Sequence, residues 1–197
     1  IKIPNDWEMV HFGDIVDYAK GFGFKSKDYT KNGVRIIRVS DTTFTSIKNN
    51  NPIFINKDDA KHYRKWELLE DDLIFSTVGS KPPMYDSLVG RAIIIDRKHQ
   101  GCLLNQNAVR IRIKNKTKLK QILLLNHFRT KRYIKFIEEI YRGNANQASI
   151  TLHDLFQFPI PLPKSEEEQN IIAQPLFNID ELIKQLDYLI TKKKNIK

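Results

Sequence analysis

Several kinds of residue are scarce in this chain, and each scarcity argues against a class of protein. There is one cysteine, Cys102, so no internal disulfide can form, and the five histidines have no metal-ligand spacing. We expect Cys102 to be a small buried thiol in a reducing cytoplasm. No apolar run approaches the roughly 20 residues of a membrane-spanning helix, and no apolar segment follows Lys2 as it would in a signal peptide. The sequence predicts a cytoplasmic protein that binds neither a metal ion nor a membrane.

Acidic residues are absent from one long stretch, 97–137. That stretch holds twelve cations: Arg97, Lys98, Arg110, Arg112, Lys114, Lys116, Lys118, Lys120, Arg129, Lys131, Arg132 and Lys135. Because the whole chain carries +10, the remaining residues together carry −2. A positive field concentrated in this way attracts polyanions such as nucleic acids. A solvated lysine-rich face is the other interpretation of the same charge run.

The remaining composition fits one folded domain with an appendage. Of the 197 residues, 41% are apolar and 10% aromatic, which supports a hydrophobic core. Short β-branched segments at 34–39, 73–78 and 91–95 predict strands. Residues 109–114 alternate strictly, so Ile111 and Ile113 should face one side of a strand and Arg110, Arg112 and Lys114 the other. We predict an α+β (mixed α/β) domain over 1–163.

Helices are predicted at two places. An apolar stripe over 117–140 favours one helix of about 24 residues, with Gly143 as its left-handed cap. The alternating prolines of 159–163 predict an extended strut. A second long helix should then occupy 164–197, because Ser165 and Glu168 form a capping box.

The second helix carries a heptad pattern that is typical of helix pairing. Its apolar residues step by four and three: Ile172, Leu176, Ile179, Ile183, Leu186 and Ile190. Pro175 lies inside this segment, where it should either kink the helix or mark the start of its straight part. We therefore expect this helix to pair with another helix, as in a coiled coil.

Short motifs in a fixed order give the chain a resemblance to a known family. The C-terminal pieces are Phe158 to Pro163, Glu168-Gln169, Ile172-Ala173, Leu176 and Asp180, preceded by Gly143, Gln147, Ile150-Thr151 and Asp154-Leu155. Earlier pieces are Ile3-Pro4, Trp7, Gly13 to Ile15, Lys25 to Tyr29, Gly33, Ile36 to Asp41, Leu69 to Ser76, Val78 to Ser80, Val89-Gly90 and Leu104 to Asn107. Together they resemble the specificity subunits of type I restriction-modification enzymes.

The resemblance implies a target recognition domain at 1–163 followed by a spacer helix at 164–197. Members of that family carry two such units, read a bipartite site on double-stranded DNA, and scaffold methyltransferase subunits to which restriction subunits attach. By this resemblance the chain would be one of the two units. It would have no catalytic activity and no cofactor of its own, since S-adenosylmethionine, ATP and Mg²⁺ belong to the partner subunits. Its helix would pair with a second copy or with the second half of a longer subunit.

DNA recognition needs cations for phosphates and forked polar side chains for base edges. For phosphates we predict Lys25, Lys27, Lys81, Arg110, Arg112 and Lys114. For base edges we predict Arg38, Ser40, Ser80, Arg91, Arg142, Asn144, Asn146 and Gln147. The amides of 143–149 could instead serve only their own backbone, and the family match at 105–107 suggests a framework role there.

Two other functions remain open from the sequence. A nuclease would need a constellation of acidic and basic residues, and the acidic doublets Asp71-Asp72 and Glu138-Glu139 are followed by no convincing catalytic motif. A scaffold or RNA-binding module would also suit basic strands, with Phe22, Phe24 and Tyr29 as base-stacking candidates.

Overall fold

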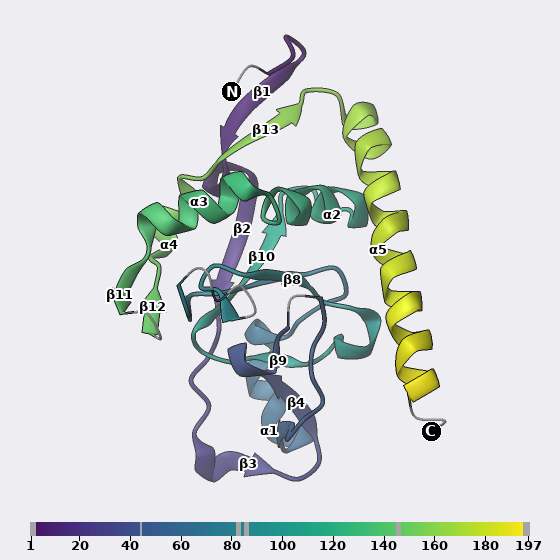
Figure 1. Ribbon diagram of the computed structural model, residues 1–197. Coiled ribbons are helices and arrows are strands. Elements are labelled where there is room, and N and C mark those ends of the chain that lie inside the picture. Colours follow the sequence, from purple (N-terminus) through teal and green to yellow (C-terminus); the bar gives the residue numbers. More distant parts are fainter. Residues whose placement is uncertain (1–2, 44, 82–83, 85–86, 145–146, 195–197) are drawn as a thin grey trace.

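A four-stranded antiparallel sheet organises the fold (Figure 1). Its strands, in spatial order, are β2 (Val16–Lys20), β10 (Ala108–Ile113), β6 (Leu73–Ser76) and β8 (Ala92–Ile94). The structure is a computed structural model that describes residues 3–43, 45–81, 84, 87–144 and 147–194. Helices and strands are mixed, and the chain closes with one long helix, so the predicted fold class is confirmed.

The alternation of β10 gives the central sheet two buried faces. Val109, Ile111 and Ile113 lie in the larger core, together with aromatic side chains such as Phe12 and Phe75. Ala108 points to the opposite face and joins a second core made mostly of isoleucines and leucines. Arg110 and Arg112 share the face of Ala108 and are half-buried. The predicted alternation is confirmed, but the cationic face is partly covered rather than open to solvent.

The helix predicted over 117–140 is divided into two. α2 (Lys118–His127) and α3 (Lys131–Ile140) are separated by a turn in which Thr130 caps α3 by accepting a hydrogen bond from the N–H of Tyr133. The break lets Phe128 and Tyr133 both enter the core, where their rings lie 5.0 Å apart. The single-helix prediction is wrong because a helix-capping threonine and aromatic packing outweigh the apolar periodicity.

A second sheet forms a small lobe below the central sheet in Figure 1. Its strands, in order, are β3 (Tyr29–Thr30), β5 (Ile53–Ile55), β4 (Val34–Ile37) and β9 (Leu103–Leu104), of which only β4 and β9 run parallel. The short helix α1 (Lys57–Ala60) and a 3-10 segment, Lys61–Trp66, complete the lobe. Phe22, Phe24 and Tyr63 pack together there, which agrees with a packing role for these phenylalanines.

A third sheet occupies the region predicted to be a polar loop. Its strands, in order, are β11 (Arg142–Asn144), β12 (Gln147–Ser149) and β7 (Val78–Gly79). Gly143 lies within β11 at φ 99° rather than capping a helix. That prediction is wrong because Tyr141, with φ −67° and ψ 151°, already ends α3 in an extended conformation.

The proline strut is a strand, β13 (Pro159–Pro163), paired antiparallel with β1 (Trp7–His11). This pairing brings the first part of the domain next to the last. The helix α4 (Leu152–Phe156) precedes β13, and further 3-10 segments among the described residues lie at Phe12–Ile15, Ser26–Asp28, Val39–Asp41 and Arg97–His99. Cys102 is buried, as predicted, and burial raises the pKa of its thiol to about 11.

The long helix α5 (Glu166–Lys194) lies along one side of the domain and passes through Pro175 without interruption (Figure 1). Its N-terminal half packs on α2, with Ala173 fully buried. The indole of Trp7 donates a hydrogen bond of 2.9 Å to Glu168. Further along, Arg129 binds Asp180 at 2.7 and 2.8 Å. These contacts fix where α5 lies relative to the domain.

Candidate nucleic-acid interface

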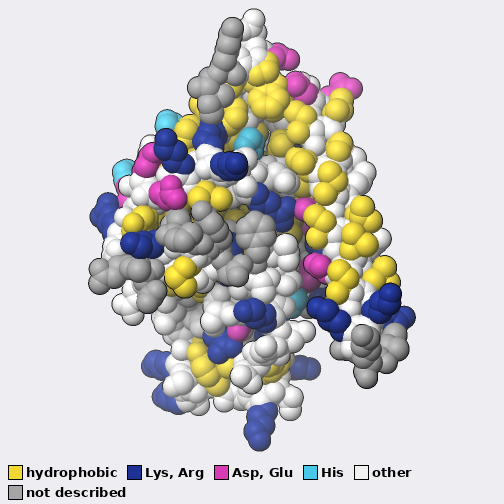
Figure 2. Space-filling model, viewed as in Figure 1, with side chains coloured by type: hydrophobic (Ala, Val, Ile, Leu, Met, Phe, Trp, Pro, Cys, Tyr) yellow, Lys and Arg dark blue, Asp and Glu magenta, His cyan; other side chains and the backbone are white. Residues whose placement is uncertain are grey.

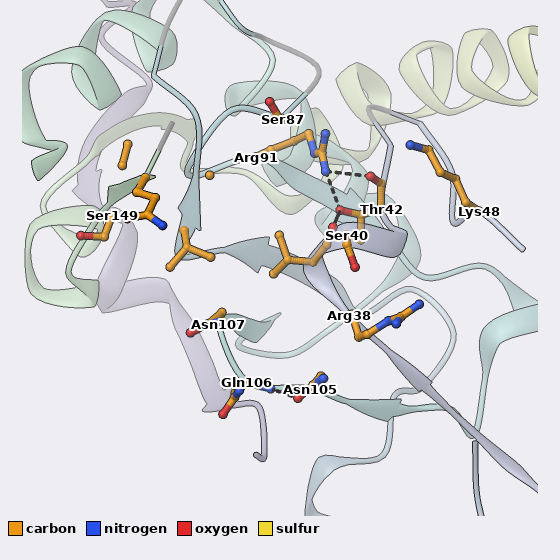
Figure 3. A pocket seen from close by; sticks show the side chains of 15 residues that line it. Arg38, Ser40, Thr42, Lys48, Ser87, Arg91, Asn105, Gln106, Asn107 and Ser149 are labelled. Carbon is orange, nitrogen blue, oxygen red and sulfur yellow. Dashed lines mark hydrogen bonds between the residues drawn. The ribbon is translucent and has the colours of Figure 1, made fainter. Parts of the chain in front are cut away.

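A cleft of about 720 Å³ lies between the small lobe and the third sheet (Figure 3). Its polar and charged lining comes from four segments: Arg38, Ser40, Thr42 and Lys48; Ser87 and Arg91; Asn105, Gln106 and Asn107; Gln147 and Ser149. Four of the predicted base-edge residues, Arg38, Ser40, Arg91 and Gln147, are therefore brought to one place. Although they are far apart in the sequence, the fold gathers them because the end of β4 and the beginnings of β8 and β12 lie at the same cleft.

Arg38 follows β4 and is held in a fixed orientation. Its Nε donates to Asp41 at 3.0 Å, and its Nη2 donates to Asp41 at 2.7 Å and to the carbonyl of Asn51 at 2.9 Å. The hydrogen bond to buried Asp41 raises the pKa of the guanidinium, so it stays charged. Nη1 donates no hydrogen bond within the described part of the chain, so the N–H groups of Nη1 remain available to a ligand.

Arg91 joins the two sides of the cleft. Only 8% of this residue is exposed. Its Nη2 donates to the carbonyl oxygen of Thr42 at 2.8 Å and to the Thr42 hydroxyl at 2.5 Å (Figure 3). A contact from Arg91 to a base stays a prediction, but the geometry already gives this cation a role in holding the loop of Thr42 in place.

The turn between β9 and β10 forms one side of the cleft. Asn105 donates its N–H to Ile37, and its side-chain oxygen accepts the N–H of Gln106 at 2.7 Å. Asn107 adopts a left-handed backbone with φ 65°, a conformation that asparagine tolerates better than most residues. Gln106 and Asn107 are exposed, and their side-chain amides form no hydrogen bond within the residues described.

A second hollow, of about 460 Å³, adjoins the same turn. Gln106 and Asn107 line it as they line the cleft, and Lys20, Thr77 and Thr151 also line it. The turn thus forms a ridge between two hollows. We call residues 106–107 the amide ridge.

Three of the predicted phosphate contacts lie near β10 but already bind protein groups. Arg110 donates to the carbonyl of Glu67 at 2.9 Å. Arg112 binds Asp72 through two hydrogen bonds, and Lys114 donates to the carbonyl of Asp14 at 2.6 Å. Their phosphate role stays a prediction, although the geometry assigns Arg110 and Arg112 to internal contacts.

The other predicted residues are spread over the molecule. Lys25 and Lys27 are exposed on the small lobe and line neither hollow. Arg142 pairs with Asp154 at 3.0 Å, and the buried Ser80 accepts a hydrogen bond from Ser87 at 2.8 Å. The structure therefore leaves these four outside the main cleft lining.

Three of the predicted DNA-binding residues lie next to or among residues that the structure does not describe. Lys81 is half-buried at the edge of a segment that includes undescribed residues. Asn144 belongs to β11 by its backbone, and Asn146 lies outside the described residues. Their proposed DNA contacts stay predictions.

Lys20 and Lys48 line the two hollows but were not among the residues predicted from the sequence, and the framework role suggested for residues 105–107 stays a prediction. Nothing in the local sequence marks Lys48, which lies in a loop of polar residues. The run Asn105-Gln106-Asn107 was the available signal, because three successive amides are more than one turn needs. Among the described residues, no group of three or more His, Cys, Asp or Glu side chains could hold a metal ion.

The apolar seam of α5 divides at its middle. Ile172 and Leu176 pack against the domain core, whereas Ile179, Ile183, Leu186 and Ile190 are exposed. Ile171, Leu182 and Leu189 are exposed as well, so the stripe is wider than predicted, and Figure 2 shows apolar side chains along much of the helix. At 3.6 residues per turn, Leu186 faces about 140° away from Ala173. Leu182 and Leu189 lie on the same side as Leu186, so these three leucines point away from the face that α5 buries on its own domain. Ile183 instead lines a hollow with Arg129 and Asp180 on the domain side.

None of the helices in the described part of the chain has both the length and the apolar character for a membrane crossing.

Comparison with known proteins identifies one family model and relatives that bear the same kind of name. The sequence pattern of the family described as type I restriction modification DNA specificity domain matches residues 4–193. A provisionally named type I restriction enzyme MjaX specificity subunit of Methanocaldococcus jannaschii is 28% identical over 99% of this chain and 45% of its own length. The EcoAI specificity subunit of Escherichia coli is 26% identical over 96% of this chain and 31% of its own length. The chain spans less than half the length of these curated relatives.

Solved structures agree on the fold. The S subunit of a type I restriction-modification system from M. genitalium superposes with a TM-score of 0.65 and 18% identity, over 99% of this chain and 45% of that chain. The HsdS subunit of Thermoanaerobacter tengcongensis gives a TM-score of 0.59 and 18% identity, over 96% of this chain and 41% of that chain. At these identities the likeness establishes the shared fold.

Proposed function

The chain belongs to the family of type I restriction modification DNA specificity domains, and on that premise we propose that it reads one half of a bipartite site on double-stranded DNA. The observation that carries the proposal is the cleft, where Arg38, Lys48, Gln147 and the amides of residues 105–107 converge from separate segments of the chain. Cations position phosphates, and forked polar side chains read base edges. The cleft supplies both kinds of group on a rigid frame.

We propose that the chain contributes recognition and leaves catalysis to its partners. In this proposal it joins methyltransferase and restriction subunits in the cytoplasm. S-adenosylmethionine, ATP and Mg²⁺ would bind to those subunits rather than to this chain.

The exposed seam of α5 supports a paired arrangement. A helix of 29 residues is about 43 Å long at 1.5 Å per residue, and one turn of B-DNA is roughly 34–36 Å. Two α5 helices packed antiparallel would hold two recognition domains about one DNA turn apart. The second helix belongs either to another copy of this chain or to the second half of a longer subunit.

Binding assays with matched ligands test the proposal. We would titrate the purified chain with duplex DNA, single-stranded DNA and structured RNA at physiological salt, alone and with its methyltransferase subunit. The proposal expects preferential duplex binding and no cleavage or methylation by the chain alone in Mg²⁺ and S-adenosylmethionine. Preference for RNA would favour an RNA-binding module, and cleavage by the isolated chain would favour a nuclease. Either result would contradict the proposal.

A further inference from the structure

The amide ridge, Gln106 and Asn107, lies where two hollows of the surface meet. Both residues line the cleft of about 720 Å³ and the hollow of about 460 Å³. A DNA groove is a recess bounded by two raised phosphate backbones. A ridge with a hollow on each side is complementary to that shape, because the ridge can enter the groove while each backbone lies in a hollow. Arg38 and Lys48 lie in one hollow and Lys20 in the other, so each hollow has a cation for a phosphate.

The backbone of the ridge is fixed by neighbouring segments. The N–H of Gln106 donates to the carbonyl of Phe22 at 2.9 Å. The carbonyl of Asn107 accepts from the N–H and hydroxyl of Thr77 at 2.9 and 3.0 Å. A Cβ on Gly21 would lie 1.9 Å from the carbonyl oxygen of Asn105, so the backbone at Gly21 packs directly against the backbone of the turn that precedes β10. The ridge therefore presents its side chains from a rigid base.

The three amides of this turn divide into two roles. Asn105 uses its side-chain oxygen to hold the N–H of Gln106, so it serves the framework. Gln106 and Asn107 are exposed, and within the described residues their amides bind no protein group. A side-chain amide holds a carbonyl oxygen, which accepts, and an NH2 group, which donates, in one plane. This arrangement matches the N6 donor and N7 acceptor of adenine in the major groove.

We propose that Gln106 and Asn107 are specificity-determining residues that enter the DNA groove and each read an A·T base pair. The inference rests on the proposed function and adds to it the residues and the class of base pair. Arg38, Lys48 and Lys20 position the flanking phosphates, and Asn105 keeps the ridge in shape.

Selection of bound sequences from a randomised duplex library tests the inference. The variants are Gln106→Ala and Asn107→Gly, because glycine retains the left-handed backbone while removing the amide. The control is Asn115→Gly, since Asn115 is also exposed, has φ 54° and lines neither hollow. We expect each ridge variant to lose roughly 5- to 150-fold discrimination at an A·T position, as one bidentate contact provides, with the rest of the motif kept. The control should select the wild-type motif.

The possible failures are distinguishable. Ridge variants that select the unchanged motif would overturn the inference while leaving DNA recognition intact. Variants that weaken binding to all sequences equally, with every position still selected, would also overturn it, because the ridge would then serve phosphates or folding. A wild-type chain that enriches no sequence would overturn the proposed function together with this inference. Thermal unfolding of each variant confirms that it is folded before selection.

Discussion

Arg112 and Asp72 form a two-point ion pair, with Nε and Nη2 of the arginine 2.6 and 2.8 Å from the two carboxylate oxygens. The pair joins β10 to the residue that precedes β6, and Asp72 is fully buried. Asp72 also accepts from Lys116 at 3.0 Å and from the N–H of Leu69 at 2.8 Å. An arginine that alternates with isoleucine along a strand is therefore part of the internal frame of the domain.

Replacing Arg112 should mainly lower the stability of the fold, because its side chain binds Asp72 rather than facing a ligand. Arg112→Ala leaves a fully buried carboxylate with a weaker set of partners, and we expect the free energy of unfolding to fall by about 3 kcal/mol. Lys114→Ala is the control, because that lysine is exposed and should change stability by only about 0.5 kcal/mol. Urea denaturation measures both. Equal stability of the two variants would contradict the structural role of the ion pair.

The same ion pair predicts a dependence of stability on pH. Burial alone would raise the pKa of Asp72, but hydrogen bonds from Arg112, Leu69 and Lys116 hold it below the ordinary value of 3.8. The folded state therefore binds this proton less readily than the unfolded state. The stabilisation of the fold by this carboxylate is therefore present above pH 3.8, the ordinary pKa of the group. It is lost as the pH falls from there through the pKa of the folded state.

Asp72→Asn provides the matching measurement. Urea unfolding between about pH 5 and pH 2 should show a steeper loss of stability for the wild type than for the variant. If the two proteins lost stability in parallel over this range, another carboxylate would be responsible.

Lys48 should contribute to DNA affinity through a phosphate. It is exposed, lines the cleft and forms no ion pair within the described residues. Lys48→Ala should reduce the slope of log K against log salt by about 0.9, the value for one phosphate contact. Lys164→Ala is the control, because its link between β13 and α5 lies at the opposite end of the molecule from the small lobe (Figure 1). An unchanged slope for Lys48→Ala would place the phosphate backbone elsewhere.

The exposed seam of α5 should drive association. Replacing Leu182, Leu186 and Leu189 by glutamine removes apolar area from the face that the domain leaves uncovered, so self-association should weaken by at least about tenfold. Tyr188→Gln is the control, since Tyr188 is 67% exposed and lies about 160° from Leu186 around the helix. Sedimentation equilibrium measures the dissociation constants. A wild-type chain that is strictly monomeric at micromolar concentration would show that the second helix must come from a longer subunit.

Local patterns predicted much of the fold. The alternation over 109–114 predicted β10, and the capping box at Ser165 predicted the start of α5, where the Ser165 hydroxyl accepts the N–H of Glu168. The patterns failed where packing outweighed periodicity. The 117–140 segment broke at Thr130 because capping and the burial of Phe128 outweighed a continuous stripe.

The sequence by itself determined the elements and the kinds of side chain available, because strand alternation, helix capping and heptad spacing depend on residues close together in the chain. It also provided an ordered set of motifs that resembled the right family. Only the tertiary structure decided which polar groups are free to meet a ligand. Arg112 is engaged by Asp72, forty positions away, while Lys48 and Gln106, 58 positions apart, line one cleft. Such assignments depend on contacts between distant segments, and local sequence patterns do not encode those distances.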